Sequence, residues 1–302
     1  MERRPVSTMS RGVAVVGGGP AGLSAAIELR RRGVGQVTVY EREQHAGGIP
    51  RHTNHLGFGA RDLHRMMTGP RYARALIERA ELAGAELRLG TSVFSLDELD
   101  ADAVILATGV RERPRAARLV PGDRPAGIFT TGSVHQLALA GHRVGTRAVI
   151  VGAEHVSFSA ILTLAHAGCR SVAMVTHLPR HQSYTVIKLA TASLRRVPVL
   201  TGVEVAEIVG RRRVERVVLS DGRTIGCDTV VFTGDWIPDN ELARRTGLTM
   251  DPTINGPVVD HTFRTSRNGV FAIGNLVHHV AAADRCALDG RAVAAEVVRS
   301  LA

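Results

Sequence analysis

The chain has 302 residues and a mass of 32.2 kDa, which is enough for two domains of ordinary size. Its 44% hydrophobic and 22% charged residues are typical of a globular protein and exclude disordered and fibrous classes. The formal net charge is +10, but Lys188 is the only lysine, and arginines cluster only at 30–32 and 211–213. We expect no nucleic-acid partner, because no nucleic-acid motif or interleaved aromatic residues accompany these runs.

The sequence also indicates whether the protein binds a metal ion and in which cell compartment it is expected. Cys169, Cys227 and Cys286 are isolated and form neither a CxxC pair nor a metal-ligand spacing, so we expect reduced, buried thiols and no metal site. No stretch reaches transmembrane length, and no apolar segment of signal-peptide length precedes the first glycines. We therefore expect a cytoplasmic protein with no membrane partner.

Residues 13–41 predict a strand, a glycine turn, a helix and a second strand. Gly17, Gly19 and Gly22 form a GxGxxG pattern between the first strand and the helix. In this pattern the first glycine allows a tight turn, the second lets the backbone approach a pyrophosphate, and the third lets the helix pack on the strand. The helix N-terminus adds N–H groups and a partial positive charge.

The second strand ends at Glu41, 19 positions after Gly22. A carboxylate at this place binds the ribose hydroxyls of a dinucleotide and argues against a 2′-phosphate. Because strand, helix and acid provide the context that the motif requires, we interpret the segment as a dinucleotide site rather than a structural turn.

The next residues predict a loop and further elements of the same domain. Gly47 and Gly48 mark a loop where the backbone can approach a second part of a long cofactor. A break at Gly69 and Pro70 separates two segments with helical periodicity. The predicted ranges are 61–67 and 72–83 for the helices, and 86–90 and 101–109 for two parallel strands.

Residues 111–125, rich in proline and arginine, indicate a crossing to a second domain. Residues 147–176 then repeat the opening pattern in degenerate form, with Gly152, Glu154 and Ser157 at the three glycine positions. A carboxylate at the second position adds bulk and like-charge repulsion toward a pyrophosphate.

The second strand of this repeat ends near Thr176 and offers no acid for a ribose. Arg180 is a candidate for a 2′-phosphate, with a merely solvated loop arginine as the alternative. We therefore expect this domain to bind NAD(P)H poorly or not at all.

The remaining residues predict three antiparallel strands and a buried strand over 201–234, with a hairpin turn at Asp221 and Gly222. Pro238 and Gly247 bracket a short helix. A buried strand at 269–275 follows, and then a helix with a small-residue face that resumes after Gly290.

With residues 13–41, ILATG at 105–109 and GVFAIGN at 269–275, the chain resembles the two-dinucleotide-binding-domain flavoproteins of the pyridine nucleotide-disulfide oxidoreductase superfamily, of thioredoxin-reductase size. The resemblance covers essentially the whole chain. It implies an α/β fold of two Rossmann-like domains. The FAD-binding domain is then discontinuous, at 1–115 and 236–302, with an inserted NAD(P)-binding-like domain at 116–235.

The resemblance also assigns an FAD site. The absence of CxxC argues against thioredoxin-reductase activity, and Asn275 replaces the usual aspartate, although an amide still donates and accepts hydrogen bonds. The residues implied to bind FAD are Gly17, Gly19, Pro20, Ala21, Gly22, Glu41, Arg42, Gly48, Val93, Ala107, Thr108, Gly109, Gly274 and Asn275.

Residues 47–73, 151–168 and 274–291 further resemble the flavin subunit of heteromeric bacterial amine and amino-acid dehydrogenases. This group includes the sarcosine oxidase alpha-type, opine and hydroxyproline dehydrogenase, and hydrogen cyanide synthase proteins. Its members often carry a C-terminal iron–sulfur cysteine cluster, which this chain lacks. The resemblance implies a second flavoprotein subunit, an iron–sulfur or ferredoxin-like carrier, and a small-molecule substrate.

Three functions follow as hypotheses. The first is an FAD oxidoreductase acting as a subunit of an amine or amino-acid dehydrogenase or oxidase, with Arg51 and His52 as the catalytic candidates. His55, His278 and His279 are further candidates for moving a substrate proton, and the alternative for all five is a surface or structural role. The second function is a free-standing NAD(P)H-dependent reductase, and the third is a binding module with a structural flavin.

Overall fold

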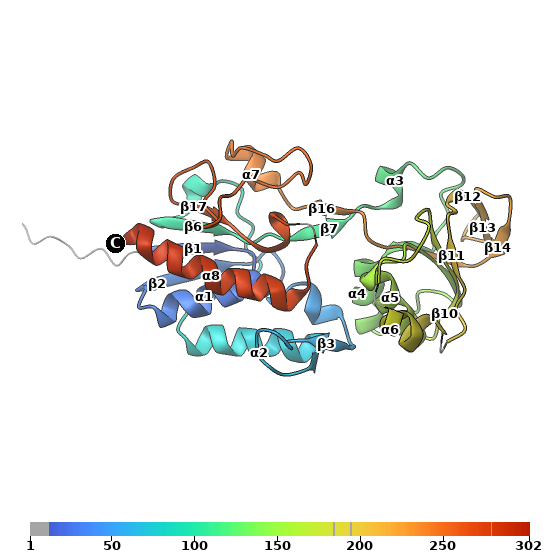
Figure 1. Ribbon diagram of the computed structural model, residues 1–302, viewed down its shortest axis with the longest axis horizontal. Coiled ribbons are helices and arrows are strands. Elements are labelled where there is room, and N and C mark those ends of the chain that lie inside the picture. Colours follow the sequence, from blue (N-terminus) through green and yellow to red (C-terminus); the bar gives the residue numbers. More distant parts are fainter. Residues whose placement is uncertain (1–11, 184, 194, 279) are drawn as a thin grey trace, which may run out of the picture. The chain divides into compact units, whose positions relative to one another are not determined.

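The computed structural model describes residues 12–183, 185–193, 195–278 and 280–302. The chain forms two compact units (Figure 1). Unit 1 comprises residues 1–51, 56–110 and 238–302, and unit 2 comprises residues 52–55 and 111–237. Apart from residues 52–55, the chain passes from one unit to the other after residues 110 and 237, whereas the boundaries implied by the resemblance lie after residues 115 and 235.

Unit 1 is built on a five-stranded parallel sheet in the order β17-β6-β1-β2-β5. All residues of β1 and β6 are buried, as expected for parallel strands that are covered on both faces. The strands are β1 (Gly12–Val16), β2 (Gln36–Tyr40), β5 (Glu86–Arg88), β6 (Ala103–Leu106) and β17 (Val270–Ala272), with a separate pair β3 (Leu56–Phe58) and β4 (Met67–Thr68).

For the helices of unit 1, the structure confirms some of the sequence predictions and corrects others. The predicted helix over 61–67 is wrong, because these residues form turns and then β4. Gly69 and Pro70 do not break a helix but begin one, since proline fits the first helical turn. The helices are α1 (Pro20–Arg31), α2 (Gly69–Leu82), α7 (Glu241–Arg245) and α8 (Ala283–Leu301), with short turns η1 (Ile49–His52), η2 (Leu96–Glu98) and η4 (Gly274–Leu276).

Helix α8 runs through Gly290 without interruption, so the expected restart there is wrong. A Cβ atom at Gly290 would lie 2.2 Å from the carbonyl oxygen of Ala21. The glycine is therefore needed for the close packing of α8 on α1, which run side by side in Figure 1.

Unit 2 holds a second five-stranded parallel sheet in the order β11-β10-β9-β15-β8, and an antiparallel sheet β12-β13-β14. The predicted hairpin turn at Asp221 and Gly222 joins β13 to β14. The strands are β8 (Ile128–Thr130), β9 (Arg147–Val151), β10 (Arg170–Thr176), β11 (Val199–Thr201), β12 (Val205–Val209), β13 (Arg216–Leu219), β14 (Thr224–Gly226) and β15 (Thr229–Phe232).

The helices of unit 2 and the connecting strands complete the described fold. Strands β7 and β16 pair where the chain passes from one unit to the other. The elements are α3 (Arg115–Arg118), α4 (Thr131–Leu139), α5 (His155–His166), α6 (Thr185–Lys188), η3 (Leu189–Ser193), β7 (Val110–Glu112) and β16 (Trp236–Pro238).

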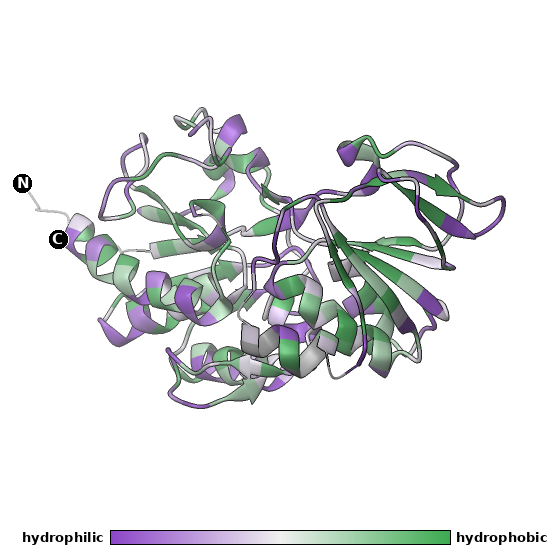
Figure 2. Cartoon of the chain, turned by 45° about the vertical axis from the view of Figure 1, so that its right-hand side comes forward, coloured by the Kyte–Doolittle hydropathy of each residue, from purple (hydrophilic) through white to green (hydrophobic). Residues whose placement is uncertain are grey.

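Each parallel sheet separates two apolar clusters. Along β1, Val15 belongs to one cluster and Val16 to the other, because successive side chains of a strand point to opposite faces. In unit 2, Ile150 and Val149 divide between two clusters in the same way. Figure 2 shows the mainly hydrophobic strands and the mixed helices that cover them. The fold is therefore mixed α/β with two Rossmann-like units.

Candidate functional site

The turn after β1 has the geometry that its glycines predict. Gly17 has a positive φ of 110°, its N–H donates to the carbonyl of Tyr40 at 2.8 Å, and a Cβ atom there would lie 2.4 Å from the carbonyl of Ala107. A Cβ atom at Gly22 would lie 2.0 Å from the carbonyl of Gly17. Both positions therefore require glycine, the first for the turn and the second for contact between helix and strand.

Gly19 differs from these two because space remains above it. It is the N-cap of α1 with an ordinary φ of −81°, and a Cβ atom there would meet nothing within 4 Å. Pro20 begins the helix, no side chain caps it, and its first turn contains no acid. The helix N-terminus therefore offers its N–H groups and positive dipole end to an anion, which fits the pyrophosphate of a dinucleotide.

Glu41 lies beside this turn, directly after β2. Its Oε2 accepts a hydrogen bond from the N–H of Gly18 at 2.9 Å, and its Oε1 accepts one from the N–H of Glu43 at 2.9 Å. The two backbone donors fix the carboxylate, which retains further lone pairs for ribose hydroxyls.

Segments far apart in sequence converge on the first turn of α1. A Cβ atom at Gly48 would lie 3.1 Å from the Cα of Gly19, and one at Gly274 would lie 3.0 Å from the Cβ of Ala21. The structure thus brings the Gly48 loop and the end of the last strand to the predicted phosphate site.

Sequence reasoning missed Asp239, which links three of the predicted residues. Its carboxylate lies 2.8 Å from Nη2 of Arg42, its carbonyl accepts the hydroxyl of Thr108 at 2.7 Å, and its N–H donates to the carbonyl of Gly109 at 2.9 Å. The only signal in the sequence was an acid directly after the strand that re-enters unit 1.

Two of the predicted residues are apolar and take part in packing. Ala107 is buried beneath Gly17, and Val93 is partly buried against the same apolar cluster as Tyr40.

The side chain of Asn275 is engaged within the protein. Its Oδ1 accepts the N–H of Ala281 at 2.7 Å, and its Nδ2 donates to the carbonyl of Ala281 at 3.2 Å. These bonds shape the loop that leads into α8. Nearby, Nε2 of His278 lies 3.2 Å from Oδ2 of Asp289, which is only 2% exposed. His279 lies outside the described residues.

The two catalytic candidates fall in different units. The guanidinium of Arg51 pairs with Glu43 in unit 1. His52 belongs to unit 2, together with Thr53 and His55. Nε2 of His55 lies 2.6 Å from the hydroxyl of Ser159.

The degenerate turn of unit 2 keeps the backbone of the first turn. Gly152 has a φ of 132°, and its N–H donates to the carbonyl of Val175 at 2.7 Å. Glu154 is the N-cap of α5, and it forms a reciprocal capping box with Ser157. Arg180 is exposed in the loop after β10.

The cysteines have the burial that was expected. All three are free and buried, and burial raises the pKa of Cys169 and Cys227 to about 11 and that of Cys286 to about 12. Within the described ranges, no group of three or more His, Cys, Asp or Glu side chains is placed to hold a metal ion.

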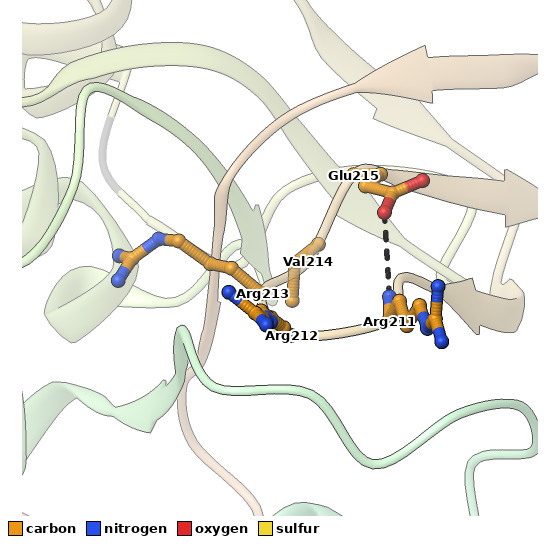
Figure 3. A pocket seen from close by; sticks show the side chains of 5 residues that line it. All are labelled: Arg211, Arg212, Arg213, Val214 and Glu215. Carbon is orange, nitrogen blue, oxygen red and sulfur yellow. Dashed lines mark hydrogen bonds between the residues drawn. The ribbon is translucent and has the colours of Figure 1, made fainter.

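A cavity of about 530 Å³ lies elsewhere in unit 2 and is lined by Arg211, Arg212, Arg213, Val214 and Glu215 (Figure 3). These residues lie between β12 and β13, and Arg213 uses its guanidinium to hold the carbonyl of Asp228 at 2.8 Å. The cavity is therefore a hollow beside a surface turn and offers no glycine turn for a nucleotide.

The fold and the first glycine turn define a dinucleotide-binding protein with two Rossmann-like units. Residues 11–290 match the family described as "Pyridine nucleotide-disulphide oxidoreductase". The chain belongs to this family, which confirms the resemblance seen in the sequence. Members of the family bind FAD and use NAD(P)H, and the chain is an FAD-dependent oxidoreductase.

Known proteins of several kinds are similar to it. The ferredoxin–NAD(+) reductase subunit of the benzene 1,2-dioxygenase system of Pseudomonas putida is 30% identical over 290 residues, covering 89% of this chain and 67% of that protein. An opine oxidase subunit from Agrobacterium tumefaciens is 26% identical, covering 95% of this chain and 65% of that protein. The chain thus spans about two thirds of the length of these relatives.

The solved structure of T. acidophilum thioredoxin reductase matches with a TM-score of 0.82 and 22% identity, covering 97% of this chain and 100% of that chain. At this identity the match shows the fold alone. Among the described helices, none is long and apolar enough to cross a membrane.

Proposed function

We propose that the chain is the FAD-carrying subunit of an amine or amino-acid dehydrogenase or oxidase complex. The observation that carries the proposal is that the cysteines are free, buried and weakly acidic, so no thiol pair is available to relay electrons from the flavin. When bound, FAD would supply the hydride and electron chemistry, and no thiol pair of this chain would take part in it.

The residues around α1 have defined parts in this proposal. Gly19 and the N-terminus of α1 hold the diphosphate, and Glu41 orients the ribose. Asp239 fixes Arg42 and the Thr108 turn beside them. Asn275 sets the loop before α8 on the other side.

Similarity to opine oxidase subunits supports the complex, because each of those proteins is by its name one part of an oxidase. In this proposal a second flavoprotein subunit oxidises the substrate, and an iron–sulfur or ferredoxin-like carrier takes the electrons. Similarity to ferredoxin reductases supports such a carrier as the partner.

The second candidate is a free-standing NAD(P)H-dependent reductase. It is favoured by the 30% identity with a ferredoxin–NAD(+) reductase subunit. The two candidates differ in the electron donor, which is an amine in the complex and a reduced nicotinamide in the free-standing enzyme.

The visible spectrum of the purified chain under anaerobic conditions separates the candidates. We expect a yellow protein whose flavin is reduced neither by amines nor by amino acids until the second subunit is added. Rapid amine turnover by the chain alone contradicts the subunit proposal. Bleaching of the flavin absorbance by micromolar NADH or NADPH, with free FAD as the control, supports the free-standing reductase instead.

Arg51 and His52 remain the catalytic candidates of this chain in the assembled complex, for moving a proton that accompanies electron transfer. Replacing His52 by Ala is expected to lower kcat of the complex roughly tenfold or more if it moves a proton. The matched control is His142→Ala, which removes an exposed histidine of unit 2 that has no proposed role. Equal losses in both variants contradict a specific role of His52.

A further inference from the structure

The two glycine turns have the same backbone but different side chains at one position. Gly17 and Gly152 each donate to the carbonyl at the end of the neighbouring strand, at 2.8 and 2.7 Å. The N-cap residues that follow also agree, with φ −81° and ψ −175° at Gly19 and φ −86° and ψ 178° at Glu154. The difference between the two turns therefore lies in the side chain of Glu154.

The carboxylate of Glu154 is held by donors of its own unit. Its Oε2 accepts the hydroxyl of Ser157 at 2.7 Å and lies 3.2 Å from Oγ1 of Thr233, and Ser157 in turn accepts the N–H of Glu154 at 3.0 Å. The backbone N–H of Ser157 also donates to this carboxylate. Ser157 and Thr233 are almost fully buried, so these donors are fixed.

This carboxylate lies over the turn itself. Its Oε2 is 2.7 Å from the place of a Cβ atom on Gly152, and its Oε1 is 2.6 Å from the place of one on Gly234. Gly234 is fixed in turn by Arg118, whose Nη2 donates to its carbonyl at 2.8 Å. In unit 1 the equivalent position above Gly19 is open.

We infer that Glu154 supplies unit 2 with an internal anion at the N-terminus of α5, in the place of the diphosphate of a nicotinamide dinucleotide. The inference rests on the proposed function and deepens it, because in that function an amine or amino acid is the electron donor in place of NAD(P)H. A carboxylate at a helix N-terminus satisfies the same N–H groups and dipole as a phosphate. Binding of NAD(P)H requires that this carboxylate leave its donors and that two like charges come close.

The test is calorimetric titration of the FAD-loaded protein with NADH and NADPH. We expect no micromolar binding by the natural chain, and roughly tenfold or more tighter binding by Glu154→Gly. The Gly variant is expected to fold, because glycine is accepted at an N-cap and unit 1 has glycine in the same conformation. Glu154→Gln, which removes the charge and keeps the bulk, should gain less than Glu154→Gly.

Glu204→Gln is the matched control, because it removes an exposed carboxylate of unit 2 that is not the N-cap of α5. Micromolar binding of either nucleotide by the natural chain overturns the inference. So does unchanged weak binding in both Glu154 variants when their flavin absorbance and melting temperatures are normal. If neither the natural chain nor any variant contains bound FAD, the proposed function is contradicted. The titration with NADH and NADPH tests only the inference about Glu154.

Discussion

Gly19 and Gly22 belong to one motif but have separable roles at the scale of single residues. A Cβ atom at Gly19 enters open space, whereas one at Gly22 lies 2.0 Å from a backbone oxygen. We expect Gly19→Ala to change the unfolding free energy of the FAD-free protein by about 1 kcal/mol or less and to weaken FAD binding roughly tenfold or more. Gly22→Ala should cost about 2 kcal/mol or more in stability. Chemical denaturation and flavin fluorescence titration measure both quantities, and equal destabilisation by the two variants contradicts the assignment.

The thiols provide a second prediction at this scale. With pKa values of about 11 to 12, roughly 0.1% or less of each thiol is ionised at about pH 8. We expect Cys169, Cys227 and Cys286 to resist a thiol reagent in the native protein and to react in full after denaturation. A single fast-reacting thiol in the native protein would contradict the electron path proposed above.

Asp62 predicts a specific pH dependence of stability. Its side chain is 3% exposed and accepts the hydroxyl of Tyr72 at 2.8 Å, and burial raises the pKa of its carboxyl above the ordinary 3.8. Its folded form holds the proton more tightly than the unfolded chain, so its contribution is present at low pH and is lost as pH rises through the folded pKa. In Asp62→Asn this loss should disappear, so the stability of the variant relative to the natural chain should increase as the pH rises above 3.8, the ordinary carboxyl pKa. Urea unfolding as a function of pH measures this change, with exposed Asp100→Asn as the control.

The conformation of the glycine turn could be predicted from the sequence, because it depends on residues that are close together in the chain. The spacing of Gly17, Gly19, Gly22 and Glu41 predicted the turn because its strand, helix and acid are consecutive. Asp239 was not predictable, because its partners Arg42 and Thr108 lie far away in the chain. The hydrogen bonds between the side chain of Asn275 and the backbone of Ala281 were also not predicted, because the sequence pattern does not show how the loop between them folds.

At the scale of elements, the contact of α1 with α8 depends on Gly290. A Cβ atom there would lie 2.2 Å from the carbonyl of Ala21, in the first turn of α1, which we propose as part of the FAD site. We expect Gly290→Ala to destabilise the protein by about 2 kcal/mol or more and to weaken FAD binding, because α8 must move away from α1. Gly226→Ala is the matched control, since a Cβ atom there meets nothing within 4 Å. Thermal denaturation of both variants, with and without FAD, tests this packing.

The element predictions failed where packing overrode local pattern. Gly290 looked like a helix break because glycine disfavours helices, but the approach of a second helix requires it. Residues 61–67 have helical spacing, yet Asp62 is instead fixed by Tyr72 of α2. Long segments with strong periodicity, such as β1 to β2 and β9 to β10, were predictable because each contains its own strand, turn and helix.

At the scale of the whole molecule, the two units should respond differently to FAD. The proposed binding residues lie in unit 1, and each unit has its own apolar clusters. We expect FAD to slow hydrogen exchange of α1 and of the backbone around Glu41, while peptides from β9 to β10 remain unchanged. Mass spectrometry of exchange with and without FAD measures this. Protection confined to unit 2 contradicts the site assignment.

Unit 2 is not one uninterrupted piece of chain, since it takes residues 52–55 from the end of η1 and the loop after it. Thr53 and His55 reach His135 and Ser159 there, at 3.3 and 2.6 Å. A chimera that grafts residues 111–237 onto another flavoprotein of this fold therefore leaves four residues behind. To keep the graft intact, an engineer has to transplant this loop together with it.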